Sequence, residues 1–408
     1  MWELIAVNKR NSIILLASMA AVLAGMGYLI GLMFAGPQGG FIGLAAAAGL
    51  WALLSLISFS QGDQILLASS RAMEVGQDVH PMLFNVVEEM TLAAGLPKMP
   101  KVYIIPDESP NAFATGRNPQ NASVAVTAGL LAQLNRDQLQ GVIAHEISHI
   151  IHRDILFVTL AGVMLGAIVI LAEVMLRSMW FGSMGRSRRF SGRSSRGNSG
   201  GAALAMILIA VILAILAPLF ARILYFALSR RREYLADAGA VRLTRYPEGL
   251  AGALEKIAQS TAPMTRANKV TAPMYIANPF RAAGAVGLFS THPPIEQRIK
   301  VLRSISKGTG YRDYDTAYQQ VTHLGSVVPA SGLAEKESAD IRPPAEPQPA
   351  QRPVQQRRGA QDMIRKLEGF AMLSCACGVK LKIPPNLKTN KVVCPRCGVV
   401  HSLNRQTA

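Results

Sequence analysis

Four long runs of apolar residues divide this chain into alternating hydrophobic and polar segments. The runs cover residues 13–34, 41–59, 155–176 and 202–228. The first two contain no charged residue, and the others contain one each, Glu173 and Arg222. As helices, all four are long enough to cross the hydrocarbon core of a bilayer. The pattern therefore predicts transmembrane hairpins at residues 1–60 and 155–228.

A cleaved signal peptide is the alternative for the first run. The run is too long for such a segment, and a second run follows after the short Gly-Pro-Gln-Gly-Gly turn at residues 36–40. We therefore expect both runs to anchor the protein in a membrane.

The polar segments show the periodicities of a mixed helix and sheet domain. The predicted elements before the second hairpin are a helix at residues 82–94 and strands at residues 102–105 and 122–127. Asn135 and Gln138 then form a capping box at the start of an amphipathic helix. Its predicted buried stripe is Leu139, Val142, Ile143, Ile147, Ile150 and Ile151. These elements predict an α+β domain over residues 62–324, interrupted by the hairpin at 155–228.

The composition changes after residue 324. Residues 325–360 are rich in Pro, Gln, Ala and Arg, which predicts a disordered linker. Residues 361–408 contain all four cysteines of the chain, so no disulfide framework holds the rest together. The chain is therefore expected to end in a small cysteine-bearing module.

The formal net charge of +17 raises the question of nucleic-acid binding. The positive residues are dispersed among membrane flanks, an Arg-rich loop and the tail, and no stretch interleaves basic with aromatic residues. Attraction to the membrane surface and control of topology explain the charge better. No nucleic-acid partner is expected, whereas a lipid bilayer is. The sequence gives no indication of the oligomeric state.

A pair of histidines on the amphipathic helix carries the clearest chemistry. His145 and His149 are separated by one helical turn and project from one face, so both can hold a single zinc ion. Glu146 lies beside the first and is placed to act as general base on a water molecule. The alternative is an ordinary pair of surface histidines, which the Glu between them disfavours. The pattern predicts a zinc peptidase.

A catalytic zinc site needs a third protein ligand, and two residues compete for it. Glu233 begins a helical pattern after the fourth apolar run, with Asp237 one turn later on the same face. Such an Asp can accept the outer N–H of a zinc-binding histidine and fix its tautomer. His152 is the competing ligand, but three ligands so close together on one straight helix strain a tetrahedral site. We therefore predict that Glu233 is the ligand.

The predicted ligands lie close to the apolar runs. Six positions separate His149 from Ile155, and five separate Leu228 from Glu233. At about 1.5 Å per helical residue, the metal would lie roughly 10 Å from the membrane surface. The predicted enzyme would cut chains close to the bilayer.

The loop between the third and fourth runs conflicts with this topology. Both ligand segments must lie on the same side of the membrane, which two crossings between them allow. The loop carries Arg177, Arg186, Arg188, Arg189, Arg193 and Arg196, and the positive-inside rule would keep it in the cytoplasm. A cytoplasmic catalytic domain with two full crossings would place it outside. Whether the second hairpin fully crosses is left open at this point.

Four segments together resemble the HtpX-type membrane metalloproteases. The segment Ala-His-Glu-Ile-Ser-His-Ile-Ile-His-Arg-Asp at residues 144–154 resembles the active-site helix of that family. The other three are Ser-Arg-Arg-Arg-Glu-Tyr-Leu-Ala-Asp at 229–237, Asn-Ala-Phe-Ala-Thr-Gly at 111–116, and Thr-His-Pro-Pro-Ile-Glu-Gln-Arg at 291–298. The similarity covers about residues 1–305, including the four apolar runs.

The resemblance implies a zincin-like endopeptidase of the bacterial inner membrane, multi-pass, with its catalytic domain and C-terminus in the cytoplasm. Its expected substrates are misfolded membrane proteins, or peptides from them. Zinc would be bound by His145, His149 and Glu233, with Glu146 catalytic.

The resemblance also suggests how the substrate is held. The segment Asn111, Ala112, Phe113 and Ala114 would form an edge strand that pairs with an extended substrate; a plain turn after Pro110 is the alternative. His292 and Arg298 would donate hydrogen bonds to the oxyanion, although His292 could equally be a turn residue before Pro293. Arg153 and Asp154 are expected to anchor the helix among lipid headgroups.

The C-terminal module departs from that family. Its cysteines form two close pairs, separated by 16 residues and each followed by glycine: Cys375 with Cys377, and Cys394 with Cys397. This is close to the spacing of a zinc ribbon with four thiolates. Disulfides fit a reducing cytoplasm poorly, and an iron site has the same ligands. The sequence predicts one structural zinc in addition to the catalytic one.

Two other classes of function compete with the peptidase. A catalytically silent membrane scaffold, with structural zinc and a ribbon that binds a partner, would not need Glu146 or an open ligand position. A transporter would need a polar path across the membrane, whereas Glu173 and Arg222 lie near the ends of their runs. The pattern favours the peptidase.

Overall fold

A computed structural model gives the architecture of the chain. It describes residues 2–155, 168, 172–173, 177, 219, 230–265, 274–279, 292–334, 338–345, 353–387, 389 and 391–402.

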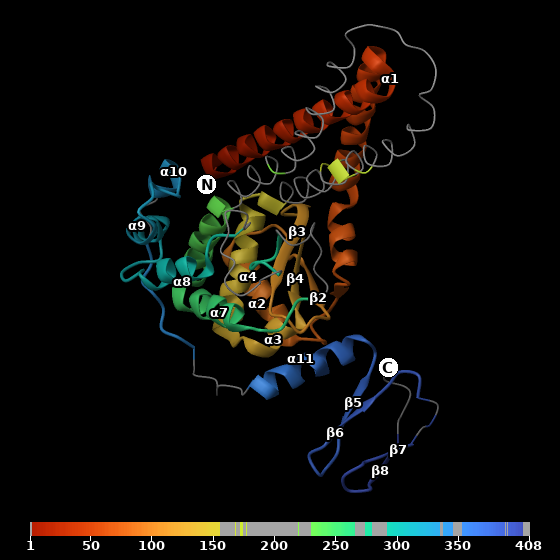
Figure 1. Cartoon of the computed structure of the whole chain (residues 1–408). Helices are drawn as coiled ribbons and strands as arrows, with labels where there is room; N and C mark the ends of the chain where they lie inside the picture. The colour runs from red at the N-terminus through yellow and green to blue at the C-terminus, as the bar shows by residue number, and fades with distance from the viewer. Residues whose placement is uncertain are drawn as a thin grey trace, which may run out of the picture.

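The N-terminal segment is a helical hairpin that projects from the globular part of the molecule (Figure 1). Helix α1 (Trp2–Ser69) reverses at a kink, where Ala35 and Gly36 leave the helical conformation before Pro37. Residues Ala35–Ser69 form a helix long and apolar enough to cross a membrane, and Leu16–Leu32 form a shorter apolar helix. The runs at residues 155–176 and 202–228 lie almost entirely outside the described residues. Four transmembrane helices therefore stay a prediction.

A four-stranded sheet forms the centre of the domain. Its strands are β1 (Met73–Glu74), β2 (Lys101–Ile105), β3 (Ala112–Asn118) and β4 (Asn121–Thr127). Their order is β1-β2-β4-β3, with β2 parallel and β3 antiparallel to β4. The strands predicted at 102–105 and 122–127 are confirmed as β2 and β4. Strand β3 lies at the open edge of the sheet.

Alternation along the strands gives the sheet two buried faces, because successive side chains point to opposite sides. One face, with Val124 and Val126, joins the main core formed with the helices. The other face carries Phe113 and Ala125 and packs against Leu67 at the end of α1 and against Tyr275. The edge strand is therefore in direct contact with the base of the N-terminal hairpin.

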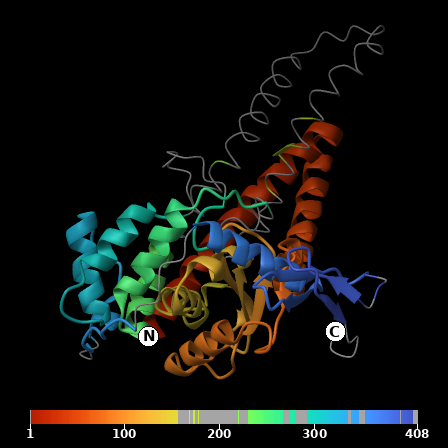
Figure 2. The same cartoon turned by 90° about the horizontal axis from the view of Figure 1, so that it is seen from below.

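Helices pack beside the main face of the sheet (Figures 1 and 2). They are α2 (Pro81–Ala93), α3 (Ala128–Gln133), α4 (Arg136–Ile151), a helix at residues 230–244, α7 (Pro247–Gln259), α8 (Ile295–Arg303), α9 (Tyr311–Thr322) and α10 (Ala330–Ala334). Helix α4 lies against β3 and β4, and α7, α8, α9 and α10 follow in successive contact beyond α4. The predicted capping box begins α4, since the side chains of Asn135 and Gln138 each accept the other's backbone N–H. The α+β fold is confirmed for the described residues.

The C-terminal segment continues through α11 (Pro353–Leu367) into two hairpins, β5 (Ala371–Ser374) with β6 (Lys380–Ile383) and β7 (Lys391–Val393) with β8 (Val400–Ser402). Helix α11 packs against α3. Its Arg357 and Gln361 contact Glu108 at 3.2 and 2.9 Å, and Ala360 is buried.

The prediction of a disordered linker over residues 325–360 is wrong for the described part of that segment. Residues 330–334 and the first residues of α11 are helical. Arg342 donates to the carboxylate of Asp137 at 2.7 Å and to the backbone oxygen of Thr244 at 3.0 Å. The polar composition concealed a segment that is held by charge-assisted hydrogen bonds to the domain surface.

Candidate metal centre

Three side chains from two distant segments converge beside the sheet. His145 and His149 come from α4, and Glu233 comes from the helix at residues 230–244. The two Nε2 atoms lie 3.3 Å apart, and each lies 3.7 Å from a carboxylate oxygen of Glu233. Four-coordinate zinc with bonds of about 2.0–2.1 Å to its ligands requires about 3.3 Å between ligand atoms. The three residues therefore fit one tetrahedral ion.

Small residues allow the two ligand-bearing helices to approach closely. Ala236, Ala238 and Ala240 are buried in the helix at 230–244. At Gly239 an added Cβ atom would collide with the side chain of Ser148 on α4. The close approach places the carboxylate of Glu233 opposite the two imidazoles. His152, the competing ligand, lies outside this cluster, and its Nε2 is 3.4 Å from the hydroxyl of Tyr311.

Asp237 occupies its predicted place behind the first histidine. Its Oδ1 lies 2.9 Å from Nδ1 of His145, and both side chains are fully buried. Burial alone lowers the pKa of His145, but hydrogen bonds to Asp237 and Glu233 outweigh it and raise the pKa to about 9. With Nδ1–H donated to Asp237, Nε2 faces the other ligands.

Arg298 packs against the carboxylates of the centre. Its guanidinium is buried and donates to both oxygens of Asp237, to Glu233 Oε2 at 3.1 Å and to the backbone oxygen of Ile276 at 3.0 Å. These carboxylates hold the pKa of Arg298 well above its usual range despite burial. The donors of Arg298 are thus directed at Glu233, a predicted ligand, and at Asp237, which lies behind His145. Its predicted contact with substrate or the oxyanion stays a prediction.

Glu146 lies next to the ligands without joining them. Its side chain is buried, and burial raises its pKa, although the two neighbouring histidines and the backbone of Ala114 act in the opposite direction. A carboxyl whose pKa is raised toward neutrality can accept a proton and later release it. Glu146 is therefore suited to the role of general base.

The edge strand directs part of its backbone away from the sheet. Thr127 N donates to Asn111 O, and hydrogen-bonded pairs alternate along an antiparallel ladder. Ala112 and Ala114 therefore present their N–H and C=O groups outward. The oxygen of Ala112 already accepts from Ile276 N at 2.9 Å, and Asn111 bonds the oxygen of Ala277. The outward edge at Ala114 adjoins Glu146.

His292 lies at the same centre. Its Nε2 is 4.0 Å from Glu233 Oε1, and the residue is buried. Burial lowers its pKa to about 4, against the opposing effect of Glu233. His292 is therefore neutral near pH 7 and lies beside the predicted ligand Glu233. Its role as an oxyanion donor stays a prediction.

Asp154 was expected among lipid headgroups, and the structure corrects this. The residue is buried, and its Oδ2 lies 3.4 Å from Nδ1 of His149. Asp154 lies beyond the end of the helix, where the helical spacing does not connect it with a ligand. The rule that zinc-binding histidines donate their other N–H to a carboxylate was the signal that could have found it.

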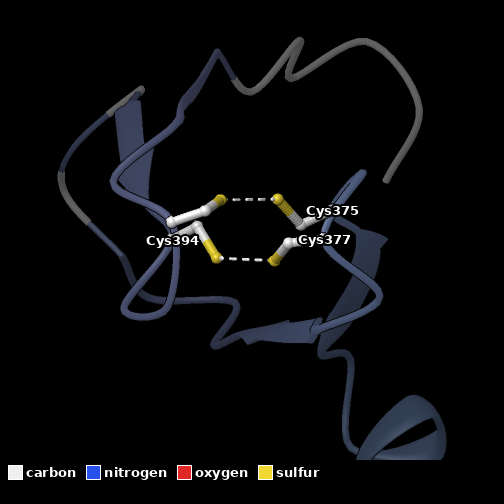
Figure 3. Close-up of side chains that lie close together, drawn as sticks. Cys375, Cys377 and Cys394 are labelled. Atoms are coloured by element: carbon white, nitrogen blue, oxygen red, sulfur yellow. Dashed lines mark hydrogen bonds between the residues drawn. The ribbon is translucent and has the colours of Figure 1, made fainter.

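The four cysteines form a second cluster in the C-terminal module (Figure 3). The Sγ atoms of Cys375 and Cys397 lie 3.4 Å apart, those of Cys377 and Cys394 lie 3.6 Å apart, and all four are within 4.8 Å. Zinc–sulfur bonds of about 2.3 Å place sulfurs about 3.8 Å apart, whereas a disulfide needs about 2.0 Å. The cluster fits a tetrahedral ion held by four thiolates.

Comparison with known proteins gives consistent matches. The family model of peptidase family M48 matches residues 77–306. The protease HtpX homolog of Thermoanaerobacter pseudethanolicus is 46% identical over 306 residues, which is 75% of this chain and 98% of the relative. The homologs from Pyrococcus abyssi (46% over 299 residues, 73% and 96%) and Streptococcus gordonii (40% over 306 residues, 75% and 100%) are similar. No solved structure matches significantly.

Proposed function

The chain belongs to peptidase family M48, and we propose that this metalloprotease is a zinc-dependent endopeptidase that cleaves membrane proteins next to the bilayer. One observation carries the proposal. His145, His149 and Glu233 bring three ligand atoms within 4.8 Å of one another, although Glu233 is far from the histidines in the sequence. Glu146 lies beside them outside the ligand set, as hydrolysis requires.

The residues divide the chemistry among themselves. Zinc held by His145, His149 and Glu233 would supply a Lewis acid that polarises the scissile carbonyl and acidifies water. Glu146 accepts a proton from the attacking water and delivers it to the departing amine. Arg298 neutralises the buried carboxylates around the ligands, and Asp237 fixes the tautomer of His145. His292 donates a hydrogen bond to the oxyanion.

We infer that the substrate binds as an added strand along β3. The outward C=O group of Ala114 supports this proposal, because an edge strand can pair with an extended peptide. The N–H of the same residue faces Glu146. Asn111 and Ala112 are already bonded to the segment at residues 275–277. Phe113 contacts the ring of Tyr275 at 5.1 Å between centroids, which fixes the start of the strand. The groove for the peptide would thus begin at Ala114.

The membrane location rests on the hairpin and its contacts. Helix α1 packs on β3, so the base of the hairpin adjoins the proposed substrate groove. Helix α4 ends four residues before the apolar run that starts at Ile155. These relations support cleavage near the cytoplasmic face of the inner membrane by a multi-pass protein. Misfolded membrane proteins are the proposed substrates, the lipid bilayer is a partner, and no nucleic acid is expected.

We assign a second, structural zinc to the cysteine cluster. Equivalent turns surround its two halves: Cys375 N donates to Val379 O, and Cys394 N donates to Val399 O, both at 2.9 Å. The glycines after each half, Gly378 and Gly398, have φ values of 83° and 72°. Such turns expose backbone N–H groups to thiolates. Hydrogen bonds from backbone N–H groups lower the pKa of Cys394 to about 6.

Two variants of the purified full chain test the proposed function. Glu146→Gln should retain both zinc ions but lose about 10²–10⁴-fold of its activity toward an unfolded membrane-protein substrate. Glu233→Ala should lose one zinc equivalent and all measurable activity. Undiminished cleavage by Glu146→Gln would refute the assignment of the general base. Retention of both zinc equivalents by Glu233→Ala would refute the ligand set and favour a non-catalytic metal.

A further inference from the structure

The Nδ1 atoms of the two predicted histidine ligands face different carboxylates. Nδ1 of His145 faces Asp237, whereas Nδ1 of His149 faces Oδ2 of Asp154 at 3.4 Å. The side chain of Asp154 is only 1% exposed, so the interaction takes place away from bulk water. A buried carboxylate beside the outer nitrogen of a metal-binding histidine is the arrangement that orients the ring and raises its basicity.

A special backbone turn brings Asp154 to this place. Five positions separate it from His149, and on a straight helix that spacing points to a different face. Helix α4 ends at Ile151, and Arg153 adopts the left-handed conformation with φ of 57°. For a residue other than glycine this conformation costs about 1–2 kcal/mol. The turn at Arg153 changes the direction of the chain, so that the side chain of Asp154 reaches His149.

Asp154 also connects the two segments that supply the ligands. Arg232 is buried, and its Nε lies 3.7 Å from Oδ1 of Asp154. Arg232 directly precedes Glu233, the third ligand. The carboxylate of Asp154 therefore contacts His149 through Oδ2. Through Oδ1 it contacts Arg232, the residue before Glu233. In the sequence, Asp154 directly precedes the apolar residues 155–228, and Arg232 follows them.

We propose that Asp154 is a positioning residue for the metal centre. It accepts Nδ1–H from His149, which leaves Nε2 of that ring free for the metal. Through Arg232 it also fixes the separation between His149 and Glu233. The inference rests on the proposed zinc site at His145, His149 and Glu233. The metal affinity then depends on Asp154 and Arg232, which flank the apolar residues 155–228 in the sequence.

Zinc affinity, measured by chelator competition on the full chain, tests this role. Glu146→Gln serves as the parent, because it cannot digest itself. In that parent, Asp154→Asn should weaken one of the two zinc sites about 10–100-fold. The amide can donate to Nδ1 and so favour the wrong tautomer. Asp154→Glu, which keeps the charge, should recover part of the affinity.

Two further variants supply the reference and the control. Glu233→Ala identifies which zinc equivalent belongs to the catalytic site. Asp137→Asn removes another carboxylate of α4, one that contacts Arg342 and no ligand, and its zinc affinity should match the parent. The unfolding temperature in excess chelator should be the same for Asp154→Asn and the parent.

The outcomes separate the inference from the function on which it rests. If Glu233→Ala keeps both zinc equivalents, the proposed catalytic site itself is wrong. If Glu233→Ala loses one while Asp154→Asn binds zinc as tightly as the parent, only the role of Asp154 is refuted. Asp154→Asn could also unfold at a lower temperature than the parent in excess chelator, with no recovery of zinc affinity in Asp154→Glu. That result would refute positioning and assign a purely structural role to Asp154.

Discussion

Arg298 holds the carboxylate of Asp237 in a two-pronged contact, with Nε 2.8 Å from Oδ2 and Nη2 2.6 Å from Oδ1. Nη1 of the same guanidinium reaches Glu233. All three side chains are buried. One cation therefore compensates a metal ligand and the partner of another ligand at the same time, which a compact ammonium group cannot reproduce.

Substitution of Arg298 should therefore lower the stability of the protein, and any loss of catalysis should follow from that. In Arg298→Met two buried carboxylates lose their cation, which should lower the free energy of unfolding by about 3–5 kcal/mol. Arg298→Lys should recover only part of this loss. Thermal unfolding in excess chelator measures the effect without the metal. A stable Arg298→Met protein that fails only in cleavage would instead indicate a direct catalytic role.

Backbone methylation of a peptide substrate should reveal strand pairing with β3. A methyl group on an N–H that faces β3 removes one hydrogen bond, which costs about 0.5–1.5 kcal/mol. The expected result is a decrease of roughly 2- to 10-fold in kcat/KM for each such methyl group. The same methyl group on the next residue, whose N–H points away, is the control. Equal effects at both positions would contradict strand addition.

Loss of one cysteine should unfold the ribbon and spare the peptidase site. In Cys394→Ser the four-thiolate set is broken, and small metal-bound modules depend on their metal for folding. The chain should lose one zinc equivalent and retain cleavage of a short peptide. Hydrogen exchange should increase across residues 371–402. Ser374→Ala, a neighbouring exposed substitution, should change none of these properties.

The N-cap of α2 should make stability depend on pH. His80 Nδ1 accepts the N–H of Leu83 at 3.1 Å, which requires the neutral ring. Burial lowers the pKa of His80 below 6.5, and the nearby Lys366 acts in the same direction. The folded state thus binds fewer protons than the unfolded state.

The stabilising contribution of His80 is therefore complete above about pH 6.5 and is lost as the pH falls toward the lower pKa of the folded protein. The cap contributes about 1 kcal/mol. His80→Asn keeps an acceptor that does not titrate. Unfolding temperatures between pH 7.5 and 5 should therefore fall less for His80→Asn than for the unmodified chain. Parallel curves would contradict the assignment.

The two halves of α1 should tolerate no larger residue at Gly31, where their backbones touch. At Gly31 an added Cβ atom would collide with the carbonyl oxygen of Gly39, whereas at Gly25 it would meet nothing within 4 Å. Gly31→Leu should separate the halves and lower the unfolding temperature, because overpacking commonly costs about 1–3 kcal/mol. Gly25→Leu, in the same helix, should be almost neutral. Equal stability of both variants would show that the halves do not pack in this way.

Much of the centre could be predicted because its chemistry follows local spacing. The separation between His145 and His149 is one helical turn, and that between Glu233 and Asp237 is another. Asn135 and Gln138 likewise mark the start of α4 by themselves. Such signals depend on residues within a few positions, so they can be read without knowledge of the fold.

Contacts set by tertiary structure could not be predicted in the same way. Arg298 has the chemistry of an oxyanion donor, and only the packing of α8 directs it to Asp237. Asp154 reaches His149 through a left-handed turn at Arg153 that no glycine announces. Helix α11 was hidden in a polar segment because its stability comes from packing against α3 and not from its composition.

The packing of α11 determines where the cysteine-bearing module lies. This helix packs against α3 and contacts Glu108, which precedes the edge strand. The start of the cysteine-bearing module therefore lies against the peptidase domain. Lys382 of β6 also contacts Asp362 of α11 at 2.5 Å, so the first hairpin of the module is bound to the same helix. The position of the four cysteines relative to Glu146 therefore depends on the contact between α11 and α3.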